Sequence, residues 1–158
     1  TIATGPRAGQ VVPVEVDTHI AGVLKFASGA LIQIVTSFDI KGHKHLPLEI
    51  YGTTGSMIVP DPNTFVGSVE LLDGKDWVEQ PLSHGHGDDN YRGIGLADMA
   101  DDIVNNRPHR ASGDLALHVL EVIEALHSSA SAGRVVAITS KVERPAPFAP
   151  GLKIGEIA

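Results

Sequence analysis

The chain has 158 residues and carries 12 Lys and Arg against 19 Asp and Glu, a formal net charge of −7. An acidic chain without a basic cluster is a poor partner for nucleic acid or an anionic membrane, and no apolar run reaches the ~20 residues of a membrane span. The absence of cysteine excludes disulfides, zinc–thiolate sites and cysteine nucleophiles. We expect one domain in a cytoplasmic setting, with 42% hydrophobic residues to form a core.

The first half of the chain predicts strands. Apolar and polar residues alternate over residues 14–26, which is typical of a strand with one buried face. Residues 30–39 form a returning strand with apolar side chains on both sides. Four more strands are predicted at residues 46–51, 56–59, 68–72 and 76–82. The short links, among them the hairpin signal Asp73-Gly74, predict antiparallel neighbours.

The second half predicts two helices. The first begins at residue 91 or 95 and ends at 105. Its apolar positions are predicted to face the core, and these are Ile94, Ala97, Ala100, Ile103 and Val104. Its acidic positions are predicted to face water, and these are Asp98, Asp101 and Asp102. Ser112 is the expected N-cap of the second helix, which ends at Ala132 before Gly133.

The order of these elements predicts the fold class. Strands first and helices last indicate an α+β fold, with an open, mainly antiparallel sheet and two helices packed on one face. Residues 135–138 are predicted to add a short edge strand. Since residues 30–39 are apolar on both sides, we expect the other face of the sheet to be covered by another domain or another subunit.

One histidine cluster resembles a metal site. His43-x-His45 followed by Glu49 has the spacing of the first half of the cupin metal motif. Histidines two apart on a strand point the same way and can share an ion. The partner motif with a third histidine is missing from the sequence, and two long helices do not suit a jelly roll. We therefore expect no metal here.

A second cluster lies in a polar, glycine-rich loop before the first helix. His84-x-His86 and two following aspartates suit a loop that closes over a substrate better than a preformed ion cage. Tyr91 and Arg92 stand where the loop meets the helix, where they can bind an anionic or polyol ligand. The alternative is that Arg92 fixes the loop by bonding carbonyls. We predict His84, His86, Tyr91 and Arg92 as substrate-binding residues.

Other patterns are less specific. Asp114 with His118, and Asp39 with His43, have the spacing of a carboxylate that holds an imidazole. On a helix such a pair is more often a surface pair. The run that starts at Gly93 opens like a dinucleotide-binding turn, but an aspartate stands where the third glycine belongs and no strand precedes it. The chain therefore has no predicted cofactor-binding residue.

Several stretches together point to a family. They are residues 16–22, 36–39, 48–56, 59–63, 92–100 and 107–113. The most specific part is Glu-Ile-Tyr-Gly-Thr-Thr-Gly at 49–55, running into Val-Pro-Asp-Pro-Asn at 59–63. From about residue 5 to 145 the chain resembles the C-terminal domain of the Gfo/Idh/MocA oxidoreductases, the glucose–fructose oxidoreductase and inositol dehydrogenase family. Residues 1–145 would then be a substrate-binding and oligomerisation domain, and 146–158 an extended tail.

The resemblance implies an NAD- or NADP-dependent parent enzyme that acts on a secondary alcohol of a sugar, inositol or related polyol. The family's N-terminal Rossmann domain is missing from this chain, so we expect the chain alone to be inactive. The family's catalytic aspartate–histidine pair precedes the first strand of the sheet, and neither aspartate–histidine pair of this chain matches it by position. Homo-oligomers through the open sheet face are expected. The alternatives are a free-standing interaction module that dimerises through its sheet, and a cupin-like metal-binding protein.

Overall fold

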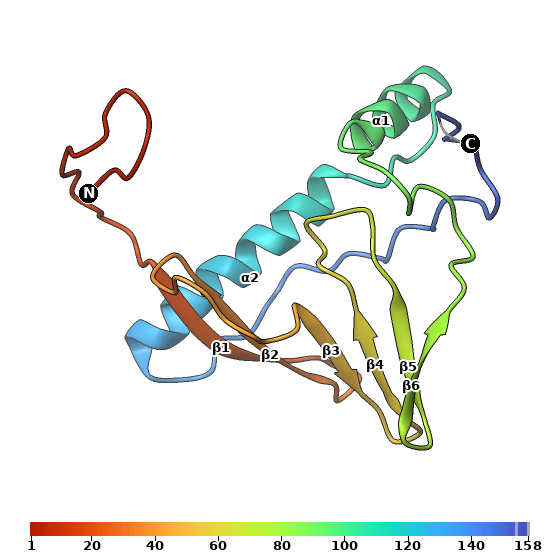
Figure 1. The fold of residues 1–158 in the computed structure, drawn as a ribbon. Coiled ribbons are helices and arrows are strands. Elements are labelled where there is room, and N and C mark those ends of the chain that lie inside the picture. Colours follow the sequence, from red (N-terminus) through yellow and green to blue (C-terminus); the bar gives the residue numbers. More distant parts are fainter. Residues whose placement is uncertain (154, 158) are drawn as a thin grey trace. The chain divides into compact units, whose positions relative to one another are not determined.

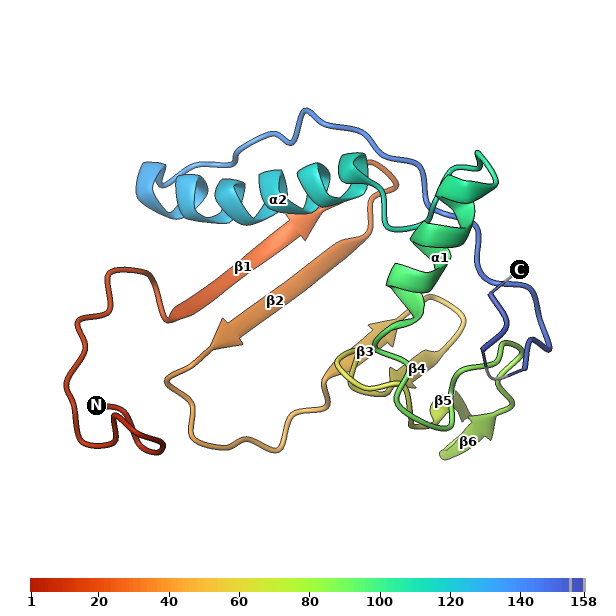
Figure 2. The same cartoon turned by 90° about the horizontal axis from the view of Figure 1, so that it is seen from above.

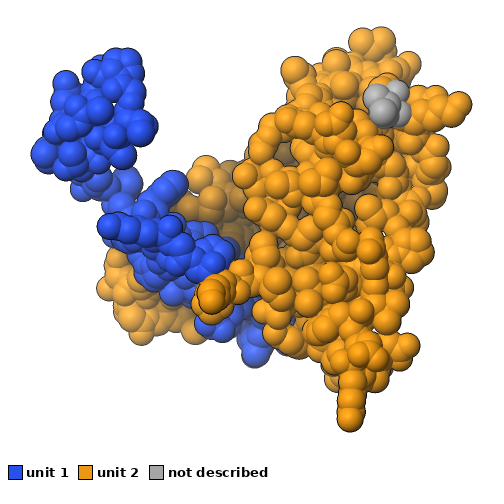
Figure 3. All heavy atoms as spheres, in the orientation of Figure 1, with its two compact units in different colours: residues 1–43 blue, residues 44–158 orange. Residues whose placement is uncertain are grey.

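The computed structural model describes residues 1–153 and 155–157. The chain divides into two compact units, Thr1–His43 and the remainder from Lys44 onward (Figure 3). Each unit contains an antiparallel sheet, and both helices belong to the second unit (Figure 1). The α+β class and the open antiparallel arrangement are confirmed. The strands form two sheets, of two and four strands, where one sheet was expected.

The first unit is built on the hairpin of β1 (His19–Lys25) and β2 (Leu31–Ser37), which run side by side in Figure 2. The strand predicted over residues 14–26 begins only at His19, because its partner β2 ends opposite that residue at Ser37. Since side chains alternate between faces, the register places Val23, Leu31 and Val35 on one face, where they are 65%, 67% and 52% exposed. The same face also carries His19, Lys25, Gln33 and Ser37, so exposed apolar and polar side chains are mixed on it.

The second unit contains a meander of four strands. They are β3 (Leu48–Tyr51), β4 (Ser56–Val59), β5 (Val69–Asp73) and β6 (Asp76–Gln80), hydrogen-bonded in that order. The predicted hairpin at Asp73-Gly74 is confirmed, since Asp73 pairs with Asp76 and Gly74 has a φ of 63°. That backbone conformation favours glycine.

Helix α2 (Gly113–Ala132) has the predicted ends. The backbone N–H of Leu115 donates to the hydroxyl of Ser112 at 3.1 Å, which satisfies one of the amides that a helix start leaves unpaired. Asp114 lies in the first turn, where a negative charge favours the positive end of the helix. Gly133 ends the helix with a φ of 60°. Both caps are confirmed.

Replacing Ser112 with alanine is expected to lower the free energy of unfolding by about 1 kcal/mol, because the Leu115 amide loses its acceptor. A Ser131→Ala variant near the other end of the same helix is the control, since Ser131 is exposed and alanine favours helix. Urea denaturation of the two variants measures the difference. Equal midpoints would show that the cap does not stabilise the helix.

Helix α1 (Ile94–Val104) presents the face opposite to the predicted one. Asp98 and Asp102 are 3% and 5% exposed, whereas Ile103 and Val104 of the predicted apolar face are exposed to solvent. The prediction that the aspartates face water was wrong for these two, because each pairs with an arginine that follows the helix. Within the described residues no apolar side chain is fully buried, so the expected apolar core is not formed there.

The segment after α2 is not the predicted edge strand. Residues 135–138 join no sheet, and the next two residues are held by a side chain instead. The amides of Thr139 and Ser140 donate to the carboxylate of Glu121 at 2.7 and 2.9 Å. Hydrogen bonds from the Ser140 hydroxyl, and then from Thr139, lower the pKa of Glu121 to about 2. The segment therefore runs along α2 (Figure 2). In the described part of the chain, neither helix has the length and apolarity needed to cross a bilayer.

Candidate functional site

The loop between β6 and α1 borders a pocket of about 630 Å³. His84, His86 and Tyr91 line it, together with Leu152 and Lys153 of the C-terminal segment. Three of the four predicted site residues are therefore brought together at one pocket. Imidazole rings and a phenol can donate and accept hydrogen bonds, so the lining is suited to a ligand that carries several hydroxyl groups.

Tyr91 is fixed at the pocket by a carboxylate. Its hydroxyl donates to Oδ1 of Asp88 at 2.5 Å, and the edge of its ring meets Phe65 with the centroids 5.8 Å apart. The hydrogen bond to Asp88, followed by desolvation, raises the pKa of Tyr91 to about 12. The hydroxyl therefore stays protonated at neutral pH, with its oxygen free to accept a further hydrogen bond.

Exchange of Asp88 for asparagine is expected to return the pKa of Tyr91 from about 12 toward 10, because the neutral amide no longer favours the protonated phenol. Because the pKa of Tyr91 is raised in the folded protein, its hydrogen bond to Asp88 stabilises the fold fully below pH 10. This contribution is lost as the pH rises through 12. Tyrosinate absorbance measures the titration. Tyr51, whose pKa is raised by Glu49, is the internal control and must not move. An unchanged titration of Tyr91 in the Asp88→Asn variant would contradict the assignment of its raised pKa to this hydrogen bond.

His86 occupies an unusual position in the loop. Its φ is 66°, in the left-handed region that is strained for a residue with a side chain. Its ring lies edge-on to Tyr91 at 4.8 Å. Among the described residues nothing hydrogen-bonds its buried Nε2 atom. A buried polar group without a partner costs about 1–3 kcal/mol, so a ligand that bonds to Nε2 would remove this cost.

Arg92, the fourth predicted residue, is not part of the pocket lining. Its Nη2 donates to the carbonyl of Asn63 at 2.9 Å and to the side-chain oxygen of Asn63 at 3.1 Å. The contact ties the start of α1 to the loop that follows β4. A substrate contact of Arg92 stays a prediction.

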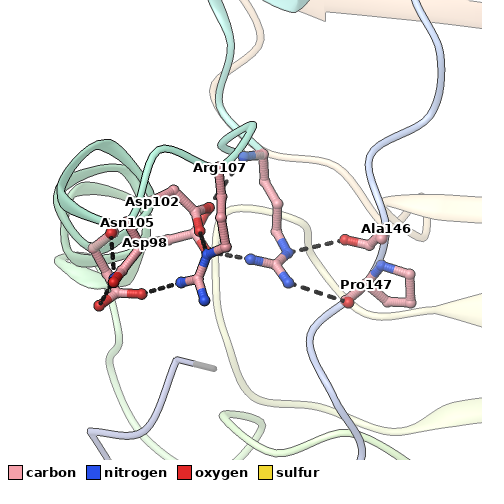
Figure 4. A network of polar contacts seen from close by, with 8 residues as sticks. Asp98, Asp102, Asn105, Arg107, Ala146 and Pro147 are labelled. Carbon is pink, nitrogen blue, oxygen red and sulfur yellow. Dashed lines mark hydrogen bonds and ion pairs between the residues drawn. The ribbon is translucent and has the colours of Figure 1, made fainter.

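An ion-pair network anchors α1 to the segments that follow it (Figure 4). Nε of Arg107 donates to Asp102 at 2.7 Å, and Arg110 pairs with Asp98. The Arg110 guanidinium also donates to the carbonyls of residues 146 and 147, at 2.9 and 3.4 Å. The two buried aspartates thus fix two arginines, and one of these arginines holds the C-terminal segment.

A line of ring contacts continues from this network to the pocket. The guanidinium of Arg110 lies 4.2 Å from the ring centroid of Phe148, and Phe148 lies 5.8 Å from the ring of His86. Neither residue, nor Lys153, was found from the sequence. The single phenylalanine among the tail's prolines was the one signal available, because a large aromatic ring favours a contact that buries it.

The other sequence candidates lie elsewhere. His43 and His45 precede β3 instead of sharing a strand, and in residues 1–153 and 155–157 no three potential metal ligands gather. Asp39 accepts a hydrogen bond from the hydroxyl of Thr18 at 2.7 Å. Nδ1 of His118 lies 2.7 Å from the hydroxyl of Ser140.

The turn that begins at Gly93 does not fit a dinucleotide. A dinucleotide cradle needs a glycine-rich turn directly between a strand and a helix. Here residues 81–93 separate β6 from α1, and Gly93 enters the helix from this long polar loop. The third glycine position is occupied by Asp98, whose carboxylate is engaged with Arg110.

Comparison with known proteins finds a family match for the first part of the chain. Residues 2–58 match the family model of the GFO/IDH/MocA C-terminal domain. No curated protein and no solved structure matches the chain. The matched range contains β1, β2 and β3 and the stretch at 49–55 that carried the resemblance. Residues 2–58 are thus similar to the GFO/IDH/MocA C-terminal domain, which supports the resemblance found in the sequence.

Proposed function

We propose that this chain is the substrate-side, C-terminal portion of an NAD- or NADP-dependent oxidoreductase that acts on a secondary alcohol of a sugar, inositol or related polyol. The match at residues 2–58 supports an oxidoreductase-family domain. The observation that carries the substrate proposal is the pocket at which His84, His86 and Tyr91 converge. Hydroxyl-rich ligands need several donors and acceptors within one concave site.

The nicotinamide cofactor would be bound outside this chain, by a Rossmann domain of the intact enzyme. Residues 1–145 would then contribute part of the wall of the substrate pocket and the oligomer contact, in a cytoplasmic enzyme. Because its own residues do not form a dinucleotide cradle, the chain alone is expected neither to bind NADH nor to oxidise polyols. Calorimetry with NADH measures the first of these, and binding in the micromolar range would contradict it.

The same proposal assigns the exposed face of the β1–β2 hairpin to a second copy of the chain. Val23, Leu31 and Val35 are exposed apolar side chains on this face. Apolar side chains that are exposed together on one face of a sheet support an interaction site there. A contact between two identical faces is closed by a two-fold axis.

Kinetics of the intact enzyme test the substrate proposal. His86→Ala and Tyr91→Phe are each expected to lower kcat/KM about tenfold, a loss of about 1.4 kcal/mol of transition-state binding, with little change in melting temperature. Tyr51→Phe is the matched control, since this tyrosine is 73% exposed on β3. Unchanged kcat and KM for substitutions at His84, His86, Tyr91 and Arg92 would refute the proposal.

A further inference from the structure

We infer that residues 146–153 form a wall of the substrate pocket, and that Lys153 selects ligands with an anionic group, a carboxylate or a phosphate. The inference rests on the proposed function, because it concerns the same pocket. It changes the expected substrate class from a neutral polyol to a charged sugar derivative. It also makes the C-terminal segment, predicted to be an extended tail, part of the binding site.

The segment is held in place by Arg110. The guanidinium donates to the carbonyls of Ala146 and Pro147 and stacks on the ring of Phe148. Arg110 is itself fixed by the buried carboxylate of Asp98. Phe148 also contacts the ring of His86, which lines the pocket. The docked segment is therefore in direct contact with the pocket lining.

Close approach of two backbones supports the same docking. A Cβ atom at Gly85 would lie 2.5 Å from the carbonyl oxygen of Leu152, which is too short for any side chain at that position. Gly85 is not among the residues with positive φ. Its missing side chain is therefore explained by the approach of the C-terminal segment, which brings Lys153 to the pocket.

Among the described lining residues Lys153 contributes the positive charge, while the carboxylate of Glu156 accepts its backbone N–H at 2.9 Å. Within the described residues the Lys153 ammonium takes part in no ion pair, and Oδ1 of the one acidic lining residue, Asp88, accepts from Tyr91. Nε2 of His86 also lacks a protein partner there. An ammonium is a compact charge that binds carboxylate or phosphate oxygens, while the imidazole and the phenol remain for the hydroxyl groups of the same ligand.

Binding to the intact enzyme tests the inference with four probes. Gluconate and glucose 6-phosphate carry the two anionic groups, and glucose and myo-inositol are neutral. We expect at least one anionic probe to bind about tenfold more tightly than the neutral ones by calorimetry, and the better of the two identifies the group. Lys153→Gln should abolish this preference without changing the melting temperature. Lys75→Gln is the control, because it removes the same charge in the exposed turn between β5 and β6.

A second pair of variants tests the docking itself. Gly85→Ala should displace the segment and lower the affinity for the anionic probe as Lys153→Gln does. Gly93→Ala should not, because a Cβ atom at Gly93 would meet no atom within 4 Å. Equal binding of all four probes, a preference for the neutral ones, or an unaltered preference in Lys153→Gln would overturn the inference and leave the proposed function standing. Failure of both anionic probes to bind would also overturn the inference, and the proposed function is tested separately by the kinetics of the pocket variants.

Discussion

Replacement of Asp98 by alanine is expected to lower the free energy of unfolding by about 3 kcal/mol, the lower end of the cost of breaking a buried ion pair. The side chain of Asp98 is 4% exposed and that of Arg110 is 30% exposed, so the arginine would be left with its charge partly out of water and unpaired. The same substitution releases the contact that orients Arg110 toward the C-terminal segment. Chemical denaturation followed by circular dichroism measures the loss.

The control for this prediction lies on the same helix. Asp101 pairs with Arg107, but both side chains are more than a third exposed, and an exposed pair contributes about 0–1 kcal/mol. Asp101→Ala should therefore shift the denaturation midpoint far less than Asp98→Ala. Equal shifts in the two variants would mean that burial does not distinguish the two aspartates.

Val35→Asp is expected to separate the proposed assembly into single copies while leaving both helices folded. The substitution places a carboxylate on the exposed face of the β1–β2 hairpin, and a charge buried there without a partner opposes association strongly. In a contact closed by a two-fold axis each substitution acts twice. Light scattering gives the mass of the particle, and circular dichroism reports the helices.

A matched variant separates this effect from the charge alone. Val135 is 90% exposed and lies outside β1 and β2, so Val135→Asp should leave the mass unchanged. An unmodified protein that is monomeric at tens of micromolar would contradict the proposed contact. A Rossmann domain of the same enzyme would then be the better candidate to cover the face.

Features fixed by neighbouring residues were predicted well from the sequence. The Asp73-Gly74 hairpin, the Ser112 cap and the Gly133 helix end all depend on residues within a few positions of one another. Residues 56–59 were predicted as a strand and form β4. Local hydrogen bonding and the conformational freedom of glycine decide such features, so the sequence carries them directly.

The orientation of α1 could not be predicted in the same way. The spacing of apolar residues predicts that the aspartates face water. It takes no account of Arg107 and Arg110, which follow the helix closely enough for their side chains to pair with its aspartates. With an arginine partner, a carboxylate can be buried at a tolerable cost. Each partner lies beyond the end of the helix, outside any window of helical periodicity.

The candidate site was predicted only in part for a related reason. Composition was enough to single out the loop that holds His84 and His86, because polar residues and glycines gather there. The contribution of Phe148 and Lys153 depends on a contact between segments about sixty residues apart. Composition gives no information on which distant segment fills a pocket.

The most direct test of the account is the oxidation of sugars, inositols and related polyols with NAD or NADP, measured as the appearance of reduced nicotinamide. We predict turnover by the proposed intact enzyme and none by the 158-residue chain alone. Absence of nicotinamide-dependent oxidation of any such alcohol by the intact enzyme, or turnover by the chain alone, would contradict the proposal that this chain forms the substrate side of a GFO/IDH/MocA oxidoreductase.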